Sequence, residues 1–165
     1  MNPIQLNPMP LLPLMQTKSR SVPDALNRHL SARNNEGLAG LGAFIEQGAA
    51  LVTPEAVEAL RSLRRSLATK IAGLADSDRL HSRLVLLSAA FDDACANGQA
   101  SSPAHREIAF ALLYFLKGAD RIPDSVPEIG LLDDAMIIQL VLRRNAATLR
   151  AEALRQDLPL PAEVA

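Results

Sequence analysis

The sequence contains very few aromatic side chains and almost no cysteine. Its 165 residues include no Trp, one Tyr, four Phe and a single cysteine, Cys95. A hydrophobic core must therefore consist mainly of Leu, Ala, Ile and Val, a composition that suits packed helices. One cysteine excludes an internal disulfide and offers no set of thiolate ligands for zinc, and it is typical of a reducing compartment. We therefore predict a cytoplasmic protein.

An excess of charge and a long apolar run are also missing. Lys and Arg total 17 against 18 Asp and Glu, and this balance argues against a nucleic-acid partner. The longest uninterrupted apolar run after the N-terminal region, residues 108–116, is far shorter than the ~20 residues needed to cross a bilayer. The N-terminus has no basic region, and its prolines would interrupt the helix of a signal peptide. We predict no transmembrane span.

Residues 1–20 are predicted to form an extended, proline-rich arm. An apolar segment left in water is unfavourable, so we expect the arm either to pack on its own bundle or to bind another chain. A protein partner or a homo-oligomer follows from the second alternative. The candidate partner-binding residues are Ile4, Leu6, Met9, Leu11, Leu12 and Leu14.

Residues 21–157 are predicted to form a single helical domain, in which start and stop signals mark the ends of each helix. The predicted helices span residues 21–34, 38–52, 53–74, 77–96, 102–118 and 131–157. The clearest start is Thr53, followed by a proline and an acid, because Thr caps a helix and Pro suits its first position. No alternating pattern is long enough for a strand. The sequence predicts an all-α bundle of five or six helices, with a frayed tail over residues 158–165.

Two of these helices are expected to form the centre of the bundle. Residues 108–116 are almost entirely apolar, and residues 135–142 carry apolar side chains at helical spacing. We predict that they pack as an antiparallel pair. The connector between them, within residues 114–134, contains Pro123 and Pro127, which restrict the backbone and favour a shaped turn.

The stretch contains a characteristic set of turn, apolar and acidic residues. They are Tyr114, Asp120, Ile122, Pro123, Asp124, Val126, Pro127, Gly130, Leu132, Asp133 and Asp134. At these positions the stretch resembles the YkvA-like family, a group of small bacterial domains of largely unknown function. The resemblance covers about residues 108–142 and implies a helical fold and a bacterial origin, but no reaction. Two places depart from the family pattern: Lys117 and Gly118 stand where the family has Ser-Pro, and Arg121 where it has an apolar residue.

Four aspartates in this stretch allow two interpretations. In the favoured one they cap turns and the start of the last helix, where carboxylates accept bonds from free N–H groups. In the other they converge on a cation, because clustered carboxylates repel unless they are neutralised, and oxygen ligands suit Mg²⁺, Mn²⁺ or Ca²⁺. The candidate metal ligands are Asp120, Asp124, Asp133 and Asp134.

The remaining residue patterns show no catalytic constellation. The three histidines are scattered over separate helices and do not form a zinc motif. We therefore predict a non-enzymatic interaction or regulatory module. The alternatives are a cation-dependent enzyme that uses the four aspartates and a peripheral membrane protein that uses the arm with a basic helix face. That basic face comprises Arg61, Arg64, Arg65, Arg79 and Arg83.

Overall fold

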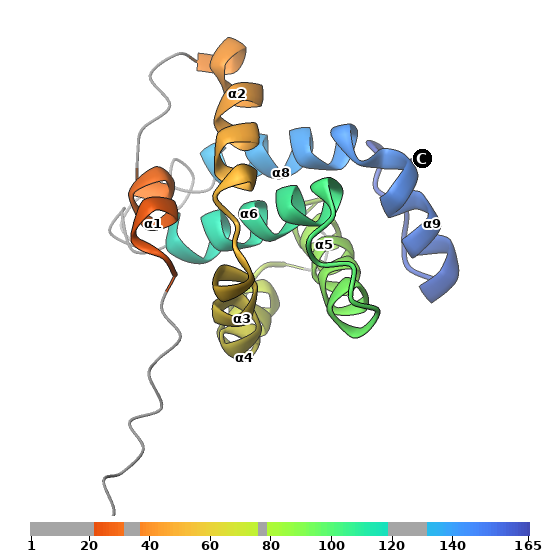
Figure 1. Ribbon diagram of the computed structural model, residues 1–165. Helices are drawn as coiled ribbons and strands as arrows, with labels where there is room; N and C mark the ends of the chain where they lie inside the picture. The colour runs from red at the N-terminus through yellow and green to blue at the C-terminus, as the bar shows by residue number, and fades with distance from the viewer. Residues whose placement is uncertain (1–21, 32–36, 76–78, 119–131) are drawn as a thin grey trace, which may run out of the picture.

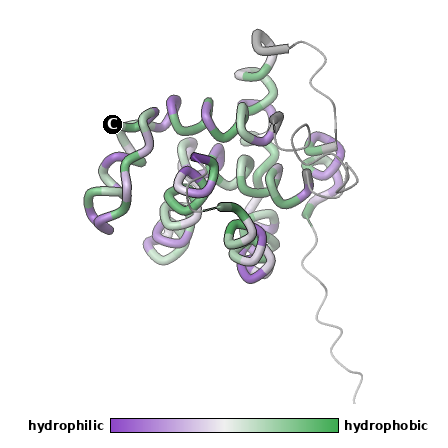
Figure 2. The backbone as a smooth tube through the Cα atoms, turned by 180° about the vertical axis from the view of Figure 1, so that it is seen from behind, coloured by the Kyte–Doolittle hydropathy of each residue, from purple (hydrophilic) through white to green (hydrophobic). Residues whose placement is uncertain are grey.

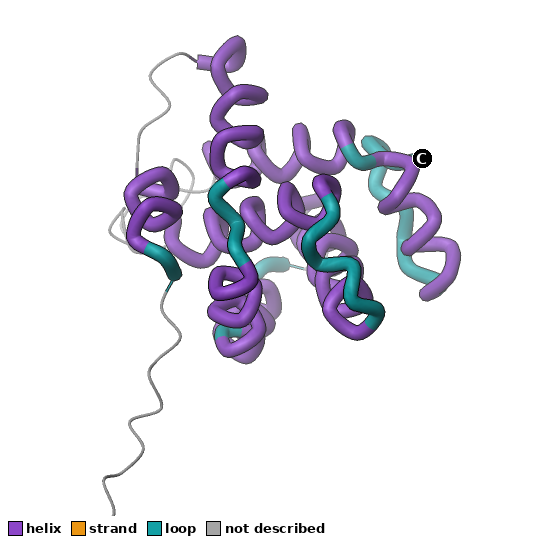
Figure 3. The backbone as a smooth tube through the Cα atoms, in the orientation of Figure 1, coloured by secondary structure: helices purple, strands orange, loops and turns teal. Residues whose placement is uncertain are grey.

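The computed structural model describes residues 22–31, 37–75, 79–118 and 132–165. Over these residues the chain is all-α, as predicted, with eight helices and no strand (Figure 1, Figure 3). The predicted N-terminal arm lies outside the described residues. The helices are α1 (Asp24–Ser31), α2 (Gly37–Ala50), α3 (Pro54–Ser62), α4 (Arg64–Ala72), α5 (Arg79–Ala96), α6 (Pro103–Gly118), α8 (Leu132–Arg144) and α9 (Ala146–Gln156).

Helix α6 occupies the centre of the bundle: α1, α2, α3, α4, α5 and α8 pack against it, and α9 packs against α5 and α8 (Figure 1). It begins at a cap in which Ser102 Oγ accepts a hydrogen bond from the N–H of His105 at 3.3 Å. Its apolar run packs against α2, α5 and α8, with α3 and α4 on a further side. The fully buried members of this run are Ile108, Ala109, Phe110, Ala111, Leu112 and Phe115. The prediction of a central helix is confirmed.

Helices α6 and α8 form the expected antiparallel pair. Arg144 at the end of α8 donates from its guanidinium to Glu107 in the first half of α6, at 2.8 Å for the closest contact. Asn145 Nδ2 donates to the other Glu107 oxygen at 2.8 Å. Arg144 also contacts Glu46 of α2 at 2.9 Å. These bonds join the start of α6 to the end of α8 and attach both helices to α2.

Glycine lets α2 approach α6 closely. A Cβ atom built on Gly48 would lie 2.2 Å from the Phe110 ring, which is closer than any van der Waals contact allows. The glycines of α2 weaken its intrinsic helix propensity. At Gly48 that cost is offset by burial of the Phe110 ring against the helix backbone.

Two helices that the sequence predicts as continuous are each divided in the structure. The helix that Thr53 starts ends at Leu63, where φ is −94° and ψ is 8°, and α4 follows directly. The last helix is interrupted at Asn145, whose Nδ2 also donates to the Val141 carbonyl at 2.9 Å. Neither position carries Pro or Gly, so local sequence signals do not mark the breaks. The six predicted helices therefore become eight in the described part of the chain.

The segment that follows α9 is ordered against the bundle. Asp157 ends α9 with a left-handed φ of 53°, and the chain turns back. Val164 is fully buried, and Glu163 forms an ion pair with Arg83 of α5. Arg150 donates to the Val164 carbonyl at 2.7 Å. The prediction of a frayed tail is wrong here, because an apolar anchor and an ion pair outweigh the helix-breaking prolines.

Hydrophobic and hydrophilic residues alternate along the outer helices, as amphipathic packing requires (Figure 2). Buried members of α5 recur at helical spacing, among them Leu80, Leu84, Leu87 and Phe91. No helix in the described ranges combines the length and the apolar character needed to span a membrane.

Candidate functional site

The structure describes only part of the predicted aspartate cluster. Asp120 and Asp124 lie outside the described residues, as does the side chain of Asp133, which is the second residue of α8. Asp134 follows in the first turn of α8 and is 1% exposed. Among the described residues, no group of three or more His, Cys, Asp or Glu side chains is placed to hold a metal ion. The cation hypothesis therefore rests on residues that the described ranges do not include.

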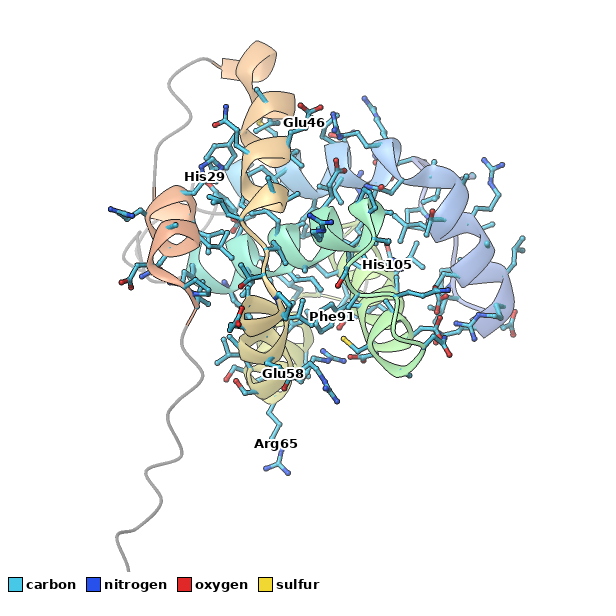
Figure 4. All side chains as sticks on the ribbon, viewed as in Figure 1. His29, Glu46, Glu58, Arg65, Phe91 and His105 are labelled. Atoms are coloured by element: carbon cyan, nitrogen blue, oxygen red, sulfur yellow. The ribbon has the colours of Figure 1, made fainter. Side chains whose placement is uncertain are left out.

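An aromatic cluster joins α1, α2 and α6. His29 stacks on Phe44 with ring centroids 4.4 Å apart, and its Nε2 lies 2.8 Å from the Phe44 carbonyl oxygen (Figure 4). Phe110 and Tyr114 of α6 pack against Phe44 at 5.6 and 5.9 Å. This stacking and hydrogen bond assign His29 a packing role between helices.

The C-terminal end of α6 is bonded by the ammonium group of a lysine. Lys70 of α4 donates a hydrogen bond to the carbonyl oxygen of Phe115 in the last turn of α6. Such carbonyls have no partner within their own helix, and a positive charge near them is favourable. Lys70 thus stabilises the end of α6 at the point where the connector to α8 begins.

The predicted basic face is largely neutralised by acids. Arg64 donates to both carboxylate oxygens of Asp92 on α5 and to Ser88 Oγ at 2.8 Å. Arg61 pairs with Glu58 at 2.7 Å. Arg83 is engaged by Glu163, as described above, whereas Arg65 points away from the bundle (Figure 4). Three of these five arginines are therefore paired with acids of the same chain.

The only cysteine is half-buried beside these charged residues. Burial raises the pKa of the Cys95 thiol, and the nearby Arg61 only partly opposes that effect. A thiol with a raised pKa carries little thiolate at neutral pH, and the thiolate is the reactive form. This environment supports a packing role for Cys95.

Helix α9 presents an apolar face to solvent. Leu154 is 68% exposed, while Leu149 and Ala153 of the same helix are buried against the bundle. Ala147 and Ala151 are also exposed, and they precede Leu154 by seven and three residues, which places all three on one side of the helix. Among the described residues, three large apolar side chains are exposed: Leu63, Leu154 and Leu160. Two of these therefore lie on α9 or within the segment that follows it.

The two arginines of α9 are bonded to other parts of the chain. Arg150 donates to carbonyl oxygens of the C-terminal segment, including Ala165 at 2.8 Å. Arg155 pairs with Glu152 at 2.7 Å and with Asp93 of α5 at 2.8 Å. Both guanidinium groups thus bond to groups of the bundle. Ala147, Ala151 and Leu154, here termed the α9 face, form an uncharged strip.

The fold defines an all-α bundle built on an antiparallel helix pair. Residues 107–140, about a fifth of the chain, match a family model described as "Protein of unknown function (DUF1232)". The resemblance to a family of unknown function is thereby confirmed over the segment where the sequence predicts it. No match was found among curated proteins or among solved structures. The α9 face lies C-terminal to the matched residues.

Proposed function

We propose that this chain is a non-enzymatic interaction module that binds a protein through the α9 face. The observation that carries the proposal is Leu154, a leucine that is 68% exposed on a strip without charge. Burying a leucine side chain is worth about 1.5–3 kcal/mol, which makes its exposure costly unless a partner covers it. The central helix pair supplies the scaffold on which this strip is displayed.

The surrounding geometry favours this function over association with a membrane surface. Association with anionic lipid would require free basic side chains, and Arg61, Arg64 and Arg83 are paired within the chain. The cation-dependent alternative requires at least three converging carboxylates, and Asp120, Asp124 and the side chain of Asp133 lie outside the described residues. We place the module in the bacterial cytoplasm, on the ground of the family resemblance and the single cysteine.

Site-specific crosslinking tests the proposal directly. A photoreactive amino acid at position 154 is expected to give a discrete protein adduct in the cells that produce this chain. The same group at position 63 is the matched control, because Leu63 is also exposed, at 37%, but lies between α3 and α4. Absence of an adduct at 154, or identical adducts at both positions, would contradict the assignment of the α9 face as a binding surface.

A further inference from the structure

We infer that residues 158–165 occupy a peptide-binding seat on their own bundle, and that an extended peptide from a partner protein displaces them. The seat consists of Arg83 on α5, Arg150 on α9 and the apolar surface that buries Val164. It shares no residue with the α9 face. The peptide that fits this seat has an acidic residue followed directly by an apolar one, as Glu163 and Val164 are in the resident segment.

Three kinds of contact hold the resident segment, and they are the contacts by which proteins bind extended peptides. The Glu163 carboxylate pairs with the Arg83 guanidinium, which recognises one side chain. Arg150 donates to the backbone carbonyl oxygens of Val164 at 2.7 Å and Ala165 at 2.8 Å, contacts that any sequence can make. Val164 is fully buried and joins the hydrophobic core. The segment runs back beside α9 without forming a helix or a strand (Figure 3).

Burial of Arg83 makes the seat selective for an acidic residue. With the segment in place, the Arg83 side chain is 12% exposed and the Glu163 side chain is 6% exposed. Burying a charge without an opposite charge beside it is strongly unfavourable. A peptide with a neutral residue at this position would leave the guanidinium buried and unpaired. The seat therefore favours peptides that supply a carboxylate to Arg83.

The resident segment fits the seat incompletely, which favours its displacement. Glu163 Oε1 contacts Arg83, but Oε2 is buried and has no hydrogen-bond partner within the described residues. A buried acceptor without a donor loses the hydrogen bonds that it makes in water. The chain also enters the segment through Asp157, whose left-handed φ of 53° is less favourable for a residue with a side chain than for glycine. Release of the segment relieves both costs, and a partner that donates a hydrogen bond to the acid avoids the first.

Fluorescence anisotropy with a labelled synthetic peptide of residues 158–165 tests the inference. The receptor is the full-length variant Val164→Asp, in which a charge at a buried position releases the resident segment but leaves Arg83 and Arg150 in place. Saturable binding of the peptide is expected. Wild type should bind the same peptide at least about tenfold more weakly, because its own segment competes at a high effective concentration.

Changes to the ion pair test whether the peptide uses the seat. A peptide with Glu163→Gln should bind the Val164→Asp receptor at least about tenfold more weakly than the unaltered peptide, because it leaves Arg83 without a carboxylate. Adding Arg83→Gln to the receptor should remove the preference between the two peptides. Arg65→Gln, which alters an exposed arginine of α4, is the matched control and should leave the affinity unchanged.

The other outcomes overturn the inference. Circular dichroism establishes that each receptor is folded, and Glu163→Lys serves as a second released variant. A folded released variant that binds no peptide shows that there is no seat, and equal affinity of wild type and the released variant shows that the peptide binds elsewhere. Equal affinity for both peptides excludes recognition of the acid by Arg83. Unfolding of both released variants would show that the segment is a fixed part of the fold. None of these results depends on crosslinking at position 154, which tests the α9 face separately.

Discussion

Lys70 contacts Phe115 in two ways: its ammonium group donates to the backbone carbonyl and lies 4.1 Å from the centroid of the phenyl ring. The first contact supplies a donor to a carbonyl in the last turn of α6, and the second is a cation–π interaction. One side chain of α4 thus stabilises both the backbone and the ring of a residue in the central helix. It does so in the last turn of α6, just before the connector to α8.

Replacing Lys70 by methionine keeps most of the apolar stem and removes both contacts. We expect Lys70→Met to lower the free energy of unfolding by about 1–2 kcal/mol, since hydrogen bonds from charged groups and cation–π contacts have this size. Urea titration followed by circular dichroism measures the change. Arg65→Met, on the exposed side of the same helix, is the control and should stay within about 0.5 kcal/mol of wild type. Equal losses in the two variants would contradict a specific role for Lys70.

Replacing each of two glycines of α2 by alanine should change the stability of the protein in opposite directions. Gly48→Ala places a methyl group against the buried Phe110 ring and should destabilise the protein by about 1–3 kcal/mol. At Gly42 an added Cβ meets only Arg144 at 3.7 Å, so Gly42→Ala should gain about 0.4–1 kcal/mol from helix propensity and reduced unfolded-state entropy. Thermal and urea unfolding of the two variants test the close approach. Stabilisation by both substitutions would show that α2 lies farther from α6.

The two acidic partners of Arg144 should differ in importance. The Glu107 side chain is 13% exposed and that of Glu46 is 64% exposed. Water screens the outer pair, so Glu46→Gln should cost no more than about 0.5 kcal/mol. Glu107 also accepts from Asn145, so Glu107→Gln disturbs a more enclosed network and should cost about 1–2 kcal/mol. Chemical denaturation of both variants measures the ranking, and a reversed order would contradict Glu107 as the main link between α6 and α8.

His105 should make stability depend on pH in the mildly acidic range. Burial lowers its pKa below the ordinary 6.5, and the carboxylates of Glu152 and Asp93 only partly offset that effect. The unfolded chain then binds a proton more readily than the folded one, so the free energy of unfolding falls as pH drops through 6.5 toward the folded-state value. The contribution levels off once both states are protonated.

The variant His105→Asn isolates this effect, because asparagine does not titrate and its side-chain oxygen can replace His105 Nδ1, which lies 2.5 Å from Ser102 Oγ. Urea unfolding of wild type and variant across this pH range measures the difference in stability. That difference should be constant at alkaline pH and move against wild type as the solution becomes acidic. A difference that is independent of pH, or one that moves in favour of wild type, would show that the pKa of His105 is not depressed.

Helical periodicity predicts the all-α fold, because apolar residues at every third or fourth position form one buried face. The central helix is predicted by a different signal, the uninterrupted apolar run over residues 108–116. The cap at Thr53 is likewise local: its Oγ1 accepts from the Ala56 N–H at 3.3 Å, only three residues away. The breaks at Leu63 and Asn145 are not predictable in this way. At Asn145 the competing bond to Glu107 comes from a residue 38 positions earlier, which only the folded arrangement brings close.

The candidate binding surface could be predicted only in part. The apolar arm is evident from composition, since its leucines occur without charge. The α9 face is not, because Leu149 and Leu154 both fit an apolar helical pattern, and only the packing of α9 on α5 determines which one is buried. The pairing of Arg155 with Asp93, which lies 62 residues earlier, similarly depends on tertiary contacts that periodicity does not encode.

The interruption at Asn145 sets the direction in which the C-terminal helix displays its surface. Each residue of an α-helix turns the next by about 100°, so one extra residue inserted into α9 before Leu154 would swing that side chain by roughly a quarter of a turn or more. The matched family segment, residues 107–140, would be unchanged by such an insertion. Such an insertion would therefore change which residues of the last helix face solvent while the central helix pair stayed the same.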